Sequence, residues 1–159
     1  MKPVFVTKDE MHIAGIGIRT SNRKGTEAIG ELWQRFYREG ILDRIIGRLH
    51  ENIVYGVYSR YESDENGEYD LLIGSEIQNG SDVPQGITLL TIPAATYAVF
   101  TSRRGPVAEV VPEVWGQIWE WSRNSGYKRT FVADFERYDM RSSGPDDVQV
   151  ELYIACQPD

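Results

Sequence analysis

The pattern of apolar and polar residues is clearest near the end of the chain. From Val148 to Ile154 every second residue is apolar, while Gln149, Glu151 and Tyr153 occupy the positions between them. A period of two is typical of a β-strand with one face in the core. The sequence therefore predicts a strand whose other face carries a carboxylate and a phenol.

A second strand is predicted just before this one. The run from Phe131 to Tyr138 alternates less regularly, and a Ser-Gly-Pro-Asp turn at 143–146 separates the two runs. We expect an antiparallel hairpin that presents its acids and tyrosines on one side. These residues are Asp134, Glu136 and Tyr138 in the first strand and Glu151 and Tyr153 in the second.

Two segments have the spacing of amphipathic helices. The apolar positions of the first are Ile29, Leu32, Trp33, Phe36 and Tyr37, with Thr26 as its N-cap and Gly40 at its end. Those of the second are Val111, Val114, Trp115, Ile118 and Trp119, with Gly126 as a left-handed C-cap. Residues 41–49 are expected to add a further helical turn.

The remaining strands complete an α+β order in which strand-helix-strand-strand occurs twice. They are predicted at Met11–Thr20, where glycines allow another backbone to approach closely, and at Ile53–Tyr61, Glu68–Ile77 and Thr96–Thr101. Glu31-Leu32-Trp33 and Glu113-Val114-Trp115 correspond at one constant offset, which favours internal duplication. We expect one domain over residues 1–159, with pseudo-repeats at about 1–80 and 86–159.

Composition narrows the classes of function. The chain of 159 residues has a formal net charge of -7, which argues against nucleic acid and favours a cationic or neutral ligand. The single Cys156 excludes an internal disulfide and fits a reducing compartment. We expect a cytoplasmic protein, because no signal peptide opens the chain and no apolar run approaches the ~20 residues that span a membrane.

Several motifs in series resemble the GyrI-like small-molecule-binding family, which includes the effector-binding domains of AraC-type and MerR-type transcription regulators. They are Tyr55-Gly-Val-Tyr58 with Tyr61-Glu-Ser-Asp64, Ile92-Pro-Ala-Ala-Thr-Tyr97-Ala-Val-Phe100, Trp115-x-x-Ile118-x-x-Trp121 with Ser125-Gly-Tyr127, Phe135-Glu136-x-Tyr138 and Val150-Glu151-Leu-Tyr153-Ile154. The resemblance implies one curved antiparallel sheet of two pseudo-twofold modules, with two main helices on one side and a ligand groove on the other. In relatives, lipophilic cations, dyes and drugs lie in that groove among aromatic rings, above a buried glutamate.

The resemblance implies specific site residues. Glu136 matches the buried glutamate, and Tyr153 matches an aromatic that contacts the ligand. From the residue types, the other candidates for ligand binding are Tyr97, Trp115, Trp119, Tyr55, Trp33, Tyr37 and Glu151. Each has an alternative. Glu136 could be a solvated strand residue or pair with Arg137 or Arg129, and Glu151 could hold a backbone amide or a cross-strand partner. The aromatic residues could belong to the core.

The first hypothesis for function is a stand-alone domain that binds amphipathic, cationic or aromatic small molecules, since strand-like sequence begins by about residue 3 and leaves no DNA-binding segment. One alternative is a cofactor-free hydrolase of cyclopropane-type toxins, in which Glu136 activates water and Tyr153 or Tyr97 donates a proton. Another is a DNA gyrase modulator or a module that binds a regulator or another protein. No cofactor or metal is expected, because His12 and His50 lack ligands at suitable spacing and no phosphate-binding loop is present.

Overall fold

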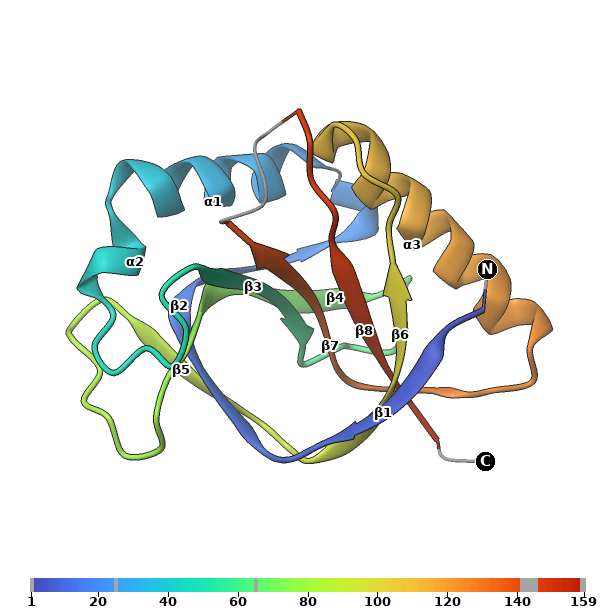
Figure 1. Ribbon diagram of the computed structural model, residues 1–159, viewed down its shortest axis with the longest axis horizontal. Coiled ribbons are helices and arrows are strands. Elements are labelled where there is room, and N and C mark those ends of the chain that lie inside the picture. Colours follow the sequence, from blue (N-terminus) through green and yellow to red (C-terminus); the bar gives the residue numbers. More distant parts are fainter. Residues whose placement is uncertain (1, 25, 65, 141–145, 158–159) are drawn as a thin grey trace.

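The computed structural model describes residues 2–24, 26–64, 66–140 and 146–157 (Figure 1). Its helices are η1 (Asn22–Lys24), α1 (Thr26–Arg38), α2 (Ile41–Arg44) and α3 (Val107–Asn124). Its strands are β1 (Val4–Lys8), β2 (Met11–Ser21), β3 (Ile53–Ser59), β4 (Glu68–Glu76), β5 (Thr88–Ile92), β6 (Ala95–Thr101), β7 (Arg129–Asp139) and β8 (Glu151–Cys156). The units β2-α1-β3-β4 and β6-α3-β7-β8 follow the predicted order, apart from the short α2 in the first of them.

All eight strands form one antiparallel sheet in the order β1-β6-β8-β7-β3-β4-β2-β5. The pairs β1·β6 and β2·β5 continue one register, because Lys8 faces Ala95 and Met11, three residues further, faces Ile92. The strands β1 and β2 therefore act as one long bent strand, and β5 and β6 as its partner. This long hairpin curls the sheet strongly, as Figure 1 shows, and the predicted α+β fold with a curved antiparallel sheet is confirmed.

Both faces of the curved sheet carry apolar clusters. On the face beneath the helices, Leu32 and Phe36 of α1 and Val114 and Ile118 of α3 pack against strand residues such as Leu152. The other face has its own cluster, built around Tyr55, Tyr97 and Phe135. Because successive residues of a strand point to opposite faces, the parity of a residue number decides which cluster its side chain joins.

Two glycines allow β2 and β4 to lie unusually close at one point. Gly15 faces Gly74 directly, and a Cβ at Gly15 would lie 1.9 Å from the Ile73 carbonyl oxygen. A Cβ at Gly74 would lie 2.0 Å from the Ala14 carbonyl oxygen. The predicted close approach of another backbone at the glycines of this strand is therefore confirmed at Gly15.

Several element boundaries differ from the prediction. The second helical segment ends at Arg44 rather than near residue 49, because Ile45 adopts an extended conformation and Gly47 has a φ of 75°. Strand β8 begins only at Glu151, and Val148 instead forms an isolated bridge with Gly105. The alternating burial is confirmed, since the apolar positions from Val148 to Ile154 are all buried.

Some expectations concern residues outside the described part. Of the turn predicted at 143–146, only the last residue is described. The side chain of Thr26, the predicted N-cap, also lies outside the described part. Duplication of the two halves stays a prediction. Within the ranges that the structure describes, no helix is long and apolar enough to cross a membrane.

Candidate functional site

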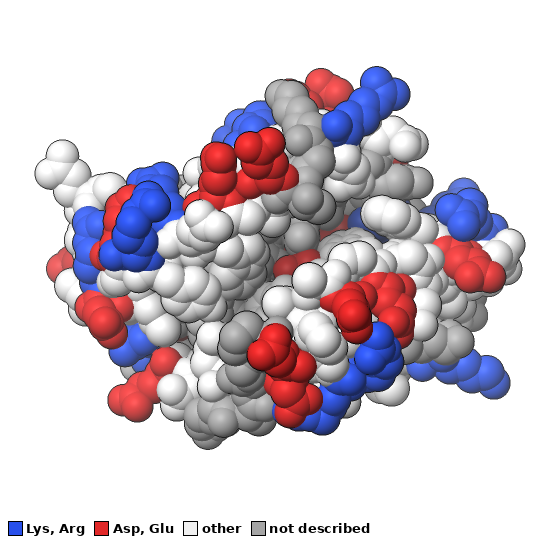
Figure 2. Space-filling model, turned by 90° about the horizontal axis from the view of Figure 1, so that it is seen from above, with Lys and Arg blue, Asp and Glu red and all other residues white. Residues whose placement is uncertain are grey.

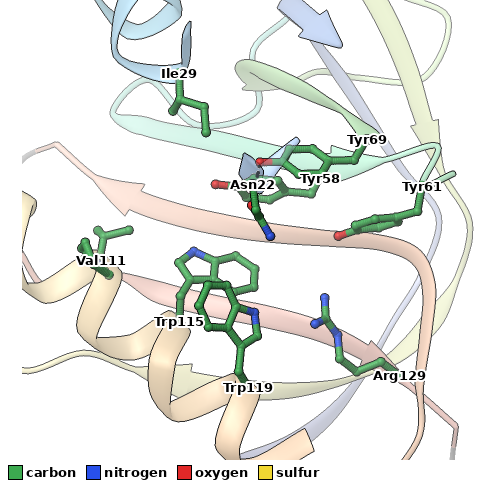
Figure 3. A pocket seen from close by; sticks show the side chains of 10 residues that line it. Asn22, Ile29, Tyr58, Tyr61, Tyr69, Val111, Trp115, Trp119 and Arg129 are labelled. Carbon is green, nitrogen blue, oxygen red and sulfur yellow. Dashed lines mark hydrogen bonds between the residues drawn. The ribbon is translucent and has the colours of Figure 1, made fainter. Parts of the chain in front are cut away.

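A groove lies between α1 and α3 on the face of the sheet that carries the helices. Figure 2 shows this face, where a hollow near the centre is surrounded mostly by uncharged side chains. The groove has a volume of about 270 Å³. Figure 3 shows its walls, formed by Asn22, Ile29, Tyr58, Tyr61, Tyr69, Val111, Pro112, Trp115, Trp119 and Arg129. The prediction that the groove lies on the side opposite the helices is wrong: α1 packs on β2 and β4 and α3 on β6, which leaves space between them.

Glu136 lies directly behind the wall of this groove. Its Oε2 accepts hydrogen bonds from the Tyr58 hydroxyl at 2.9 Å and from the Trp115 indole N–H at 2.8 Å. Its Oε1 accepts one from the Tyr138 hydroxyl at 2.9 Å. Since Tyr58 and Trp115 also line the groove, two groove residues connect the carboxylate to the space where a ligand would lie.

No positively charged side chain of the described residues compensates this buried carboxylate. Only 3% of Glu136 is exposed, and burial raises the pKa of its carboxyl group despite the hydrogen bonds, which lower it. The two arginines considered as partners are engaged elsewhere, Arg129 with Asp134 and Arg137 with Glu151. The alternative that Glu136 pairs with either arginine is therefore wrong, and in the described residues only neutral donors contact the carboxylate.

Glu136→Gln is expected to make the ligand-free protein more stable at neutral pH, because Gln keeps the shape but carries no charge to desolvate. A raised carboxyl pKa means that the folded state binds the proton more tightly than the unfolded state. The contribution of Glu136 to stability is therefore fully present below the ordinary glutamate pKa and is lost as the pH rises through its folded-state pKa. Urea unfolding of both proteins between about pH 4 and pH 8 measures this. A wild type more stable than the variant at every pH would contradict it.

A second charged cluster lies at another part of the groove. Arg129 donates a hydrogen bond from Nη2 to Asp134 Oδ2 at 2.8 Å, and the side chains are 3% and 0% exposed. The Tyr61 hydroxyl donates to the same Oδ2, and the Ala155 N–H donates to Oδ1 at 2.8 Å. Asp134 thus holds two groove residues, Arg129 and Tyr61, in place.

Four of the predicted ligand-binding residues lie on the opposite face of the sheet. They are Tyr55, Tyr97, Tyr153 and Glu151. The reason is the strand register: Glu136 faces Leu152 across the β7·β8 pair, whereas Tyr153 faces Phe135 and Glu151 faces Arg137. Directly opposed residues of an antiparallel pair share a face, so the expectation that the acids and tyrosines of both strands share one side is wrong.

Two of the four helical aromatic residues predicted for the site line the groove, and the other two are not in its wall. Trp115 and Trp119 line the groove, whose walls are therefore largely aromatic. Trp33 packs edge-on against Tyr138 with ring centroids 5.3 Å apart, which places it beside Glu136, and Tyr37 stacks on Trp33 with 54% of its surface exposed.

Eight residues of the groove wall were not among the predicted site residues. They are Asn22, Ile29, Tyr58, Tyr61, Tyr69, Val111, Pro112 and Arg129. The prediction included Tyr55 rather than Tyr58, although three residues along a strand place the two tyrosines on opposite faces. The deciding signal is the pairing of Gly56 with Glu136, which puts the even-numbered residues of β3 on the glutamate's side. That pairing depends on the fold and is not visible in the sequence.

The family model of Cass2, described as integron-associated effector binding protein, matches residues 5–156. This chain belongs to the Cass2 family of effector-binding proteins. It is 35% identical to YobU of Bacillus subtilis (strain 168) over 152 residues, which cover 94% of each chain. This likeness extends over nearly the whole chain.

Two solved structures share the fold of this Cass2 family member. One is the integron cassette protein VCH_CASS2 from the mobile metagenome of Vibrio cholerae, with a TM-score of 0.76 and 24% identity over 98% of this chain and 96% of that one. The other is SAV2435, solved with bound tetraphenylphosphonium, with a TM-score of 0.82 and 19% identity over 99% of this chain and 94% of that one. At these identities the likeness concerns the fold, which agrees with the predicted GyrI-like architecture.

Proposed function

We propose that this protein binds a lipophilic aromatic cation in the groove between α1 and α3, with Glu136 as its counter-charge. The observation that carries this proposal is a buried carboxylate directly behind an aromatic groove, whose hydrogen-bond donors among the described residues are all neutral. Tetraphenylphosphonium in SAV2435 shows that the same fold accommodates such a cation, which makes it the natural first probe.

The groove supplies two kinds of attraction for a cation of this class. Burial of apolar ligand surface contributes roughly 25 cal/mol per Å². The indole rings of Trp115 and Trp119 and the phenol rings of Tyr58 and Tyr69 add cation-π attraction. These contacts select for aromatic shape, whereas the carboxylate selects for positive charge.

Glu136 is suited to be the counter-charge of a bound cation, because folding of the ligand-free protein has already removed its carboxylate from water. A carboxylate that is buried without a cation gains more from a ligand cation than an exposed one, since water screens the interaction little. Tyr58 and Trp115 hold the carboxylate in place and also line the groove, so the ligand and the glutamate share the same two neighbours.

The pair of residues considered for a hydrolase does not meet in this structure. Glu136 lies on the helix face, and Tyr153 and Tyr97 belong to the cluster on the other face. Neither tyrosine can donate a proton to a substrate that Glu136 contacts through the groove. Binding is therefore the function that the geometry supports best.

The test compares tetraphenylphosphonium with tetraphenylborate, which has the same shape and the opposite charge. Tetraphenylphosphonium is expected to raise the melting temperature of the wild-type protein increasingly with its concentration, because it binds the folded state. Tetraphenylborate is expected to produce no such rise. Isothermal titration then gives the stoichiometry, expected to be one cation per chain. Equal shifts with both ions, or none with either, would overturn the proposal.

A further inference from the structure

Arg129 has donors that the described part of the protein leaves unused. Its guanidinium carries five N–H groups, and the single hydrogen bond that it makes to a described residue goes from Nη2 to Asp134. The side chain is 3% exposed, and its Nε is buried with no hydrogen-bond acceptor. Buried donors without an acceptor are costly, and each calls for an explanation.

The position of Arg129 shows where a missing acceptor would lie. Arg129 lines the groove, and Figure 3 shows its guanidinium between Trp119 and Tyr61, at the end of the groove that is far from Ile29 and Val111. Its guanidinium carbon also lies 4.4 Å from the centre of the Phe131 ring. The ring covers the guanidinium but supplies no oxygen. Among the described residues no further acceptor meets the Nε–H, and the groove that Arg129 lines is where a ligand would supply one.

We propose that Arg129 is a specificity residue, which donates a hydrogen bond to a neutral oxygen of the bound ligand. The preferred ligand is then an aromatic monocation that carries a carbonyl-type oxygen away from its cationic centre. This inference rests on the proposed function, because it places a second group of the same ligand in the same groove.

The charges around the groove favour a neutral oxygen over a carboxylate. Glu136 and Asp134 contribute two negative charges and Arg129 one positive charge, so a monocation balances the site. Asp134 already pairs with Arg129 at 2.8 Å. An anionic group of the ligand beside Arg129 would therefore lie close to the Asp134 carboxylate, and the two like charges would repel each other. A carbonyl oxygen accepts from the guanidinium without this repulsion.

Strand geometry sets the spacing within the ligand. Asp134 and Glu136 are two residues apart on one face of β7, so about 7 Å of strand separates them. The oxygen should therefore lie about one substituted phenyl ring from the cationic centre. Tetraphenylphosphonium with one para-acetyl group has this arrangement, and its para-isopropenyl analogue replaces the carbonyl oxygen with a carbon of nearly the same size.

Titration calorimetry with this pair tests the inference. Wild-type protein is expected to bind the acetyl compound about tenfold more tightly than the isopropenyl compound, the effect of one charge-assisted hydrogen bond. The double variant Arg129→Met with Asp134→Asn removes both charges together and should bind the two compounds equally. In the wild type, the NMR signal of the Arg129 guanidinium N–H groups should move with the acetyl compound only, and this measurement needs no variant.

The outcomes separate this inference from the proposed function. Equal affinity of wild type for both compounds, or no difference between them in the arginine N–H signals, would overturn the role of Arg129 while leaving cation binding in the groove intact. A preference for the acetyl compound that persists in the double variant would do the same. Failure of both phosphonium compounds to bind would overturn the proposed function and this inference together.

Discussion

Glu136→Gln is expected to weaken the binding of tetraphenylphosphonium by about 100-fold, or ~3 kcal/mol, the usual size of the loss when one partner of a buried charge pair is truncated. The Gln side chain keeps the volume of Glu136, and its oxygen can still accept from Trp115. The aromatic walls are unchanged, so burial and cation-π attraction remain. Calorimetric titration of wild type and variant measures the difference. A variant affinity within threefold of wild type would mean that the Glu136 carboxylate does not contribute to binding of the cation.

The matched control for this experiment is Glu151→Gln. Glu151 lies on the neighbouring strand, faces Arg137 across the pair, and points to the other side of the sheet from Glu136. Its ion pair with Arg137 is half-exposed, so its removal should change neither the fold nor the affinity for the cation. Loss of affinity in both variants would mean that the two carboxylates share a site, in conflict with the register.

The helices and strands were predictable because their signals are local. The apolar stripe of α1 and the alternation from Val148 to Ile154 each occupy a few consecutive residues, and burial follows them. The end of the second helical segment was predicted wrongly because the prediction relied on the local apolar pattern alone. The extended Ile45 and the left-handed Gly47 end it one turn after Ile41, and the apolar pattern alone contains no such stop.

The composition of the site was only partly predictable because it depends on register. The sequence shows that Tyr55 and Tyr58 have opposite faces, but only the pairing of Gly56 with Glu136 decides which tyrosine reaches the carboxylate. Arg129 and Asp134 present a further difficulty. A shift in register between Arg129 and Asp134 in the β7·β8 pair, with Phe131 at a φ of 55°, brings these two residues together. No periodicity in the sequence marks this irregularity.

The two buried carboxylates of β7, Glu136 and Asp134, have different surroundings and therefore different expected roles. Glu136 is compensated by neutral donors and remains open to a cation, whereas Asp134 is fully compensated by Arg129, Tyr61 and the Ala155 N–H. Two carboxylates on one face of one strand therefore differ in what they can bind. The first is expected to contribute mainly to ligand affinity and the second mainly to stability.

Replacing either partner of the buried ion pair between Arg129 and Asp134 is expected to destabilise the protein by about 3–5 kcal/mol, because the other charge remains buried without compensation. The double variant Arg129→Met with Asp134→Asn should recover most of this loss. Asn still offers an oxygen to the Ala155 N–H, and Met fills the space of the arginine stem. Urea unfolding of the wild type, both single variants and the double variant completes a double-mutant cycle and yields the coupling energy directly.

The exposed pair of Arg104 and Asp147 provides the control for this cycle. It has comparable geometry, with a nitrogen–oxygen distance of 2.9 Å, but its side chains are 43% and 64% exposed. Solvent screens such a pair, so Arg104→Met should leave the unfolding midpoint nearly unchanged. If the buried pair behaved in the same way, Arg129 and Asp134 would have access to water in the folded protein. The unused donors of Arg129 would then be solvated and would require no ligand oxygen, so this cycle bears on both the stability of the groove and its specificity.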